Sequence, residues 1–386
     1  MRSKSITRRR ALTGLALATV AGALVLPSTG LAGVAAIQDD VLTTAPLDQI
    51  PTRIEMVKQT KAKVTRIDIL WSKVAPTPPA NPTDPNDPVY DFKRLDLIFS
   101  SLAASGITPI VSTYSTPAWA VKGTNLPVLT EYNPNAPRPG QFGDFMQAVA
   151  TRYNGFFVPA GATAPLPRVR HFEVWNEPNL NGFFSVNGRS TLAAYKGLVK
   201  AAYPKIKLGN KSSIVIAGVG GPRSTTDAKN VGARTWLNGL VNDKSVKFDA
   251  YSQHIYPSRG PKFSSESYDK AFPTWRSLPE IYATLDKKKK GMKLYVTEAG
   301  YTTKTTKFRN VKVSLPQQKL FLTQLYNLPD VKSPRMAAVV WFNLQDNLNW
   351  PGGLLLESGA KKPSYNAFVA VAQRPIPAAL RSTLKR

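Results

Sequence analysis

Two glutamates of this 386-residue chain stand where a predicted β-strand ends. Glu177 follows the alternating stretch His171–Trp175 and precedes Pro178, which cannot donate to a sheet ladder. Glu298 closes the apolar stretch 294–297. Either glutamate alone could be a solvated loop residue or an N-cap partner. Together they predict a carboxyl pair that converges from two strands of one parallel sheet, where one group donates a proton and the other acts as nucleophile.

The rest of the chain alternates between predicted strands and predicted helices. The strands are expected at 33–38, 64–71, 108–114, 171–175, 214–219, 248–256, 294–297 and 336–344. The helices are expected at 51–61, 92–105, 141–153, 191–203, 233–242, 278–288, 316–328 and 363–372. Eight strands, each followed by a helix, favour parallel pairing and are what a closed barrel needs. We therefore predict an α/β fold with a single (β/α)8 TIM barrel over residues 33–386.

Residues 1–32 have the pattern of an export signal. Arg8, Arg9 and Arg10 precede an apolar run from Ala11 to Leu26, and small residues follow it. The arginines resemble a twin-arginine signal, and an uncleaved N-terminal anchor remains an alternative. The pattern predicts a secreted protein or one associated with the cell envelope.

The composition limits the cofactors and partners that we expect. With no cysteine and only two histidines, the chain offers neither a thiolate site nor a histidine cluster, and we predict no metal and no cofactor. The formal charge of +27 either keeps the protein soluble or attracts an anionic polymer such as an envelope glycan. Because no nucleic-acid module is recognisable, we expect no nucleic acid, and no obligate protein partner is indicated.

The run Phe-Glu-Val-Trp-Asn-Glu-Pro-Asn at 172–179, with Glu298 downstream, resembles the retaining glycoside hydrolases of clan A. The resemblance is strongest to family 39, with the cellulase-like family 5 as near neighbour. It implies that Glu177 is the acid/base and Glu298 the nucleophile of a double displacement. These roles require a raised pKa at Glu177 and an ionised Glu298.

The resemblance extends to residues around the carboxyl pair. It places Arg66 beside the nucleophile, although pairing with the local Asp68 is an alternative. It assigns the Asn176 amide to a sugar hydroxyl and the Tyr256 hydroxyl to the nucleophile. His254 is expected in the same site, or else as a core histidine.

Aromatic residues at strand ends complete the expected sugar-binding surface. The resemblance implies that Trp341 forms the floor beneath the cleaved sugar, whereas a core aromatic is the alternative. Tyr114 stands where many clan members have a histidine, and it begins the run Tyr-x-x-Pro-Ala-Trp-Ala that includes Trp119. This run favours the family 39-like subset. Sugars present apolar CH faces that stack on such rings.

The leading hypothesis is an exported retaining β-glycosidase that hydrolyses a β-linked polysaccharide or oligosaccharide. The alternative is a non-catalytic glycan-binding or envelope-associated barrel, held by its basic charge to an anionic polymer. Transfer to a sugar instead of water, exo or endo action, and the identity of the sugar stay open at this point.

Overall fold

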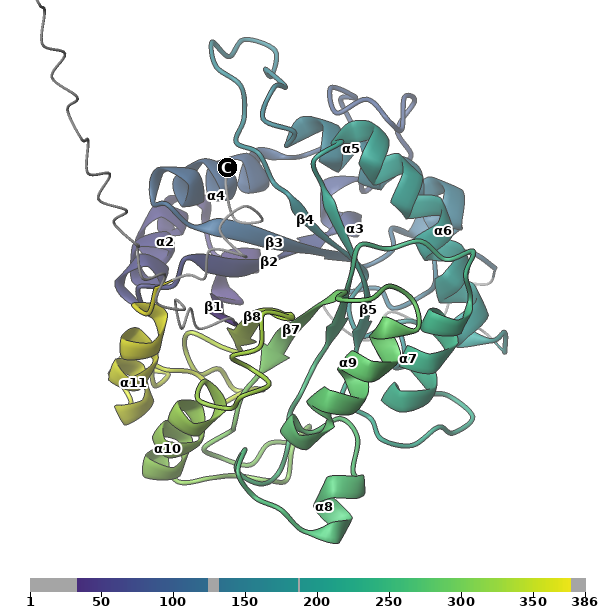
Figure 1. The fold of residues 1–386 in the computed structure, drawn as a ribbon. Helices are drawn as coiled ribbons and strands as arrows, with labels where there is room; N and C mark the ends of the chain where they lie inside the picture. The colour runs from purple at the N-terminus through teal and green to yellow at the C-terminus, as the bar shows by residue number, and fades with distance from the viewer. Residues whose placement is uncertain (1–32, 124–131, 187, 376–386) are drawn as a thin grey trace, which may run out of the picture.

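The computed structural model describes residues 33–375 except 124–131 and 187, so the predicted export signal lies outside the described residues. Eight parallel strands close in sequence order into a barrel, with helices around it (Figure 1). The strands are β1 Val34–Gln38, β2 Val64–Leu70, β3 Thr108–Tyr114, β4 His171–Val174, β5 Ile214–Gly220, β6 Ala250–Gln253, β7 Lys293–Ala299 and β8 Met336–Trp341. The predicted (β/α)8 fold is confirmed.

The helices follow the strands as the sequence predicts, with several short additions. They are α1 Val41–Thr44, α2 Ile50–Gln59, α3 Trp71–Val74, α4 Lys93–Ala104, α5 Pro139–Arg152, α6 Thr191–Gly209, α7 Ala233–Asn242, α8 Glu266–Lys270, α9 Leu278–Asp286, α10 Leu315–Leu325 and α11 Pro363–Ala372. Among the described helices, none has the length and apolar character that a membrane span requires.

Residues of each strand point alternately into the barrel and towards the helices. In β2, Val64 belongs to the small apolar cluster inside the barrel, whereas Ile67 and Ile69 pack in the large cluster beneath the helices. Arg66 has the same parity as Val64 and therefore points inward, one layer nearer the carboxyl ends of the strands. Polar side chains on this inner side reach the barrel mouth, where the active site of such a fold lies.

Two β-bulges change this alternation near the mouth. In β7, three residue steps from Val296 to Ala299 face two steps in β8, so β7 contains one extra residue. In β5, the same shift lies between Ala217 and Gly220. An extra residue interrupts the ladder and re-aims the next side chain. The bulge in β7 allows Glu298 to face inward, although Ala299 packs outward in the large cluster.

Some predicted boundaries were wrong. The helix expected to end at Tyr203 continues through Pro204 to Gly209, because Ile206 extends its buried face and offsets the lost hydrogen bond of the proline. The strand expected over 248–256 is continuous only over Ala250–Gln253, followed by an isolated bridge from Ile255 to Ala299. His254 and Tyr256, on either side of Ile255, belong to the site. The strand expected over 336–344 ends at Trp341.

The β5 bulge requires glycine at 218. Gly218 has φ +91, and a Cβ there would lie 2.2 Å from the Tyr251 ring. We predict that Gly218→Ala lowers the free energy of unfolding by about 3 kcal/mol or more, because backbone strain and overpacking add. The matched control is Gly291→Ala, because Gly291 has φ +75 but a Cβ there would meet no atom within 4 Å. This variant should lower the free energy of unfolding by about 1 kcal/mol, from backbone strain alone. Equal losses in urea denaturation would contradict this account.

Candidate active site

A strained turn after β4 presents Glu177. Trp175 has φ 74 and Glu177 has φ 42, conformations that non-glycine residues rarely adopt outside functional sites. The turn is held from β5, because the side chain of Asn179 accepts a hydrogen bond from the Gly221 backbone N–H at 2.6 Å. A Cβ on Gly221 would lie 3.1 Å from Cδ of Glu177, so glycine leaves the space that this carboxyl occupies.

Glu298 accepts two strong hydrogen bonds. Arg66 Nη1 donates to Oε1 at 2.9 Å, and the Tyr256 hydroxyl donates to Oε2 at 2.9 Å. Both donors favour the ionised form of the carboxyl group. Arg66 also lies 3.4 Å from Asp68, so both of its predicted partners are present.

Arg66 uses all five of its N–H donors on neighbours from four strands and the turn after β4. Besides Glu298, its acceptors are Gln38 Oε1 at 2.9 Å, Ser112 Oγ at 2.8 Å, Glu173 Oε2 at 2.7 Å and Asn176 Oδ1 at 2.7 Å. The side chain is only 1% exposed, so these bonds replace its hydration. The arrangement orients the Asn176 amide and anchors Glu298 from below.

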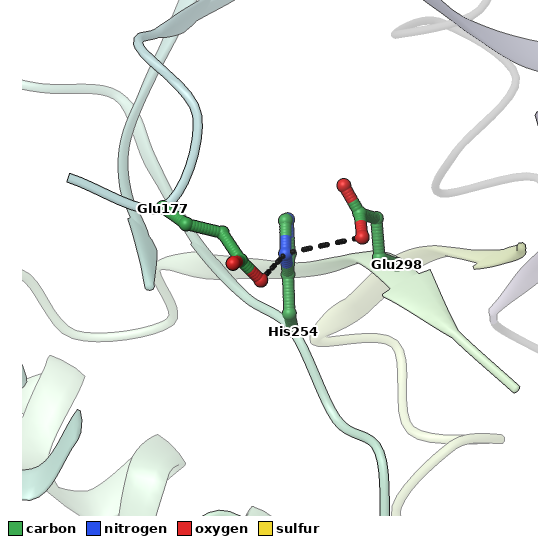
Figure 2. A group of neighbouring side chains, drawn as sticks. All are labelled: Glu177, His254 and Glu298. Carbon is green, nitrogen blue, oxygen red and sulfur yellow. Dashed lines mark hydrogen bonds and ion pairs between the residues drawn. The ribbon is translucent and has the colours of Figure 1, made fainter. Parts of the chain in front are cut away.

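The ring of His254 stands between the two glutamates (Figure 2). Its Nδ1 lies 2.8 Å from Glu177 Oε1 and 3.5 Å from Glu298 Oε2. Nε2 is buried and has no hydrogen-bond partner among the described residues. Burial lowers the pKa of His254, which favours the neutral ring at pH 7. The His254 ring thus lies between the two carboxyl groups and, being neutral at pH 7, does not offset their negative charge.

The two carboxyl groups have different protonation chemistry. Burial raises the pKa of Glu177 to about 7, with only a partial opposing effect from Arg66. Burial also raises the pKa of Glu298, while His254 and Arg66 act in the opposite direction. Glu298 accepts hydrogen bonds from two donors, whereas the His254 ring is the only hydrogen-bond partner of the Glu177 carboxyl group among the described residues. We therefore assign the proton to Glu177 and the negative charge to Glu298.

One carboxylate oxygen of each glutamate and one His254 nitrogen all lie within 4.8 Å of one another. A single divalent cation could therefore be held by these three side chains. The same atoms are the ones needed for proton transfer and nucleophilic attack, and a metal would occupy them. The absence of a metal cofactor stays a prediction.

Two predicted aromatic residues, Tyr114 and Trp119, have their hydrogen-bond partners outside the pair of glutamates. Tyr114 lies at the β1–β3 side of the mouth, where its hydroxyl donates to Asp68 at 3.1 Å. Trp119 contacts neither glutamate: its Nε1 donates to the Ala75 carbonyl, and its ring packs on the edge of Trp71. These contacts hold the partly exposed Trp119 ring, and its contact with a sugar stays a prediction.

The prediction that Trp341 forms the floor beneath the sugar is wrong. The side chain is fully buried in the cluster beneath the helices, with Nε1 donating to the Gly352 carbonyl. Val340 belongs to the inner cluster, so alternation turns Trp341 outward and Phe342 inward. The peptide bond after Phe342 is cis.

Sequence reasoning missed Phe342, whose ring lies 6.5 Å from that of Tyr256 beside the nucleophile. The rings of Phe342 and Trp350 lie 5.7 Å apart, and Trp350 lies 4.6 Å from the ring of Tyr256. Both are partly exposed, unlike Trp341. Counting alternate positions from Val340 would have identified Phe342.

Sequence reasoning also missed Glu173 and Gln38, the partners that hold Arg66. Glu173 is fully buried and lies two positions after His171 on the inner side of β4. A charged residue at an inward position of a buried strand is a signal for a buried ion pair.

The fold and this site define a (β/α)8 protein with a carboxyl pair at its mouth, the class to which clan A glycoside hydrolases belong. Residues 80–350 match the family described as glycosyl hydrolases family 39. Because the match covers more than half of the chain, the protein belongs to glycosyl hydrolases family 39. The predicted family and the predicted enzyme class are confirmed.

Named relatives agree with this assignment. A beta-xylosidase from Caldicellulosiruptor saccharolyticus is 25% identical over 301 residues, which are 72% of this chain and 56% of that protein. The chain thus spans about half the length of this curated relative.

Solved structures show the same fold at low identity. A family 39 glycoside hydrolase from Bacteroides cellulosilyticus WH2 has a TM-score of 0.62 at 19% identity, over 87% of this chain and 62% of that one. A glucosidase from Croceicoccus marinus has a TM-score of 0.64 at 16% identity, over 89% and 68%.

The buried contacts of Arg66 predict a double effect of its removal. Arg66→Met should lower the free energy of unfolding by about 3–5 kcal/mol, because Glu173 and Glu298 remain buried without their cation. Any turnover should also fall at least 100-fold. The control Arg152→Met breaks the ion pair with Asp96, whose nearest atoms are 2.6 Å apart, and should change stability without changing kcat. Unchanged kcat in folded Arg66→Met would contradict the assigned role.

Proposed function

We propose that the protein is a retaining β-glycosidase that hydrolyses a β-linked oligosaccharide or polysaccharide by double displacement. Glu177 protonates the leaving oxygen and later activates water, while Glu298 attacks the anomeric carbon. The observation that carries this proposal is the pair of carboxylate oxygens within 4.8 Å of each other, with unequal hydrogen-bond donors. Retaining enzymes place their carboxyl groups about 5–5.5 Å apart, whereas inverting enzymes need room for a water.

The surroundings of each carboxyl group support the division of roles. A nucleophile must be ionised, and Glu298 receives the Arg66 guanidinium and the Tyr256 hydroxyl. A general acid must carry a proton near neutral pH, and Glu177 is buried beside a neutral imidazole. The intact pair, with dedicated donors, favours catalysis over a purely glycan-binding barrel.

The sugar class is proposed from the relatives. A beta-xylosidase is among the curated relatives, and a glucosidase is among the solved structures with this fold. Xylose and glucose share the equatorial hydroxyl pattern of their rings. We therefore place β-xylosides and β-glucosides first among the substrates to test.

Covalent labelling tests the proposed nucleophile. A 2-fluoro glycoside slows the second displacement, so the glycosyl group should remain attached to Glu298 and be located by mass spectrometry of peptides. Glu298→Gln should lose at least 10⁴-fold in kcat, and added azide should not restore the label. A label on another residue would contradict the mechanism.

The raised pKa of Glu177 predicts the alkaline side of the pH profile. Because Glu177 acts as acid only when protonated, activity is present below its pKa and is lost as the pH rises through about 7. In Glu177→Gln this limb should disappear when a 2,4-dinitrophenyl glycoside is used, since that leaving group needs no proton. Persistence of the same limb in the variant would assign it to another group.

We also propose that the enzyme is exported and retained on an anionic envelope polymer. The pattern at residues 1–32 supports export, and the distribution of charge supports retention. The connections from each helix to the next strand, at the face opposite the mouth, carry thirteen lysines and arginines against three aspartates. Such a field attracts polyanions and is weakened by salt.

Charge-reversal variants distinguish retention by this basic face from retention by the net charge of the protein. Lys287→Glu, Lys289→Glu and Lys290→Glu together should abolish salt-sensitive retention on a teichoic-acid column. The control reverses three exposed lysines of the loop after β7, Lys304, Lys307 and Lys312, and should weaken retention less. Equal losses in the two triple variants would leave only the net charge as the cause.

A further inference from the structure

A buried lysine holds the connection between β8 and α11. Of the lysines in the described part of the chain, only Lys362 is buried, and its side chain has no exposed surface. Its Nζ donates to Asp346 Oδ1 at 2.6 Å and to Thr303 Oγ1 in the loop after β7 at 3.2 Å. Asp346 lies near the start of the connection and Lys362 is its last residue, directly before α11. The pair therefore ties the two ends of this connection together.

The same carboxyl group closes a shorter segment of the connection, residues 346–353. The Gly353 backbone N–H donates to Asp346 Oδ1 at 2.8 Å, so this amide and the lysine converge on one oxygen. Burial lowers the pKa of Lys362, while the hydrogen bond and the charge of Asp346 act in the opposite direction. Apolar side chains of similar volume often replace a buried ion pair without loss of stability, whereas the directional bonds of the pair can select one backbone arrangement.

The closed segment carries Trp350 to the barrel mouth. The Trp350 ring lies 4.6 Å from the Tyr256 ring and 5.7 Å from the Phe342 ring, and its Nε1 donates to the Phe342 carbonyl at 2.9 Å. Tyr256 in turn donates to Glu298. The sugar that Glu298 attacks must lie on this side of the site, whereas the leaving group lies towards the other glutamate. Because Trp350 is partly exposed, its ring is available to the apolar face of that sugar.

We propose that Lys362 is a positioning residue for substrate binding. By holding Asp346 at the base of the closed segment, it keeps the Trp350 ring beside Tyr256. There the ring binds the glycosyl group that is transferred to Glu298. Lys362 itself touches no substrate, because its side chain has no exposed surface. This inference rests on the proposed glycosidase function and adds to it a residue, remote from both glutamates in the mechanism, that sets the affinity for the glycosyl group.

A double-mutant cycle tests the coupling between Lys362 and Trp350. The substrate is 4-nitrophenyl β-xyloside or β-glucoside, whichever the wild-type protein cleaves faster. Lys362→Met should lower kcat/KM about tenfold, mostly through a higher KM, because it removes binding and leaves the carboxyl pair intact. Trp350→Ala should have an effect of the same size. Added to Trp350→Ala, Lys362→Met should change kcat/KM less than twofold, since the ring that it positions is already gone.

Fluorine NMR measures the placement of Trp350 without turnover. The chain has seven tryptophans, so protein labelled with 5-fluorotryptophan should give one resonance for each, and Trp350→Phe identifies the resonance of Trp350. In Lys362→Met this resonance should shift or broaden. In the control Arg152→Met, which breaks the ion pair with Asp96, it should stay in place. If Lys362→Met does not fold, Lys362→Met combined with Asp346→Asn replaces it in both experiments, because that variant leaves no unpaired buried charge.

Two results would overturn the inference. The Trp350 resonance could stay unchanged in the folded Lys362 variant, or that variant could lower kcat/KM by the same factor with and without the Trp350 ring. The second result would leave Lys362 a purely structural role. If the wild-type protein cleaves no glycoside, the proposed function fails and the role of Lys362 in binding fails with it, whereas the fluorine spectrum decides separately whether Lys362 places Trp350.

Discussion

The site depends on one buried guanidinium. Arg66 reaches from β2 to acceptors on β1, β3, β4 and β7 and to Asn176 beyond β4, and each bond is 2.9 Å or shorter. A charge in such surroundings is tolerable only because every donor is satisfied and carboxylates lie beside it. The same bonds fix the mouth, since moving Glu298 away would leave one N–H donor of Arg66 buried without an acceptor. Rigidity of the site and stability of the barrel therefore have a common origin.

Irregular backbone at the mouth orients the two glutamates in a way that regular strands could not. Strict alternation would send the side chain after Thr297 towards the helices, and the β7 bulge turns Glu298 to the inside instead. On the other side of the mouth, two left-handed residues place Glu177 over Gly221. The orientation of both glutamates is therefore set by local irregularities at the ends of β4 and β7. The distance between them is set by the positions of these two strands in the barrel.

Much of the fold could be predicted because each strand–helix unit leaves a local pattern in the sequence, and the glutamates stand at strand ends. The contacts between units that are distant in the chain could not be predicted. Glu173 and Arg66 are 107 positions apart, and nothing local marks them as partners. Trp341 was misplaced because the resemblance supplied a residue type, whereas the inward parity of Val340 favours Phe342. The bulge that aims Glu298 is likewise invisible in β7 alone, since it is defined by pairing with β8.

The central claim is that Arg66 holds Glu298 ionised at a distance from Glu177 that excludes a water between them. The stereochemistry of the first product tests this most directly, because the anomer formed at the moment of cleavage records whether one or two displacements occurred. Proton NMR of a β-glycoside during hydrolysis should show the β-anomer first, followed by slow mutarotation. Initial appearance of the α-anomer would show a single displacement and would contradict the account.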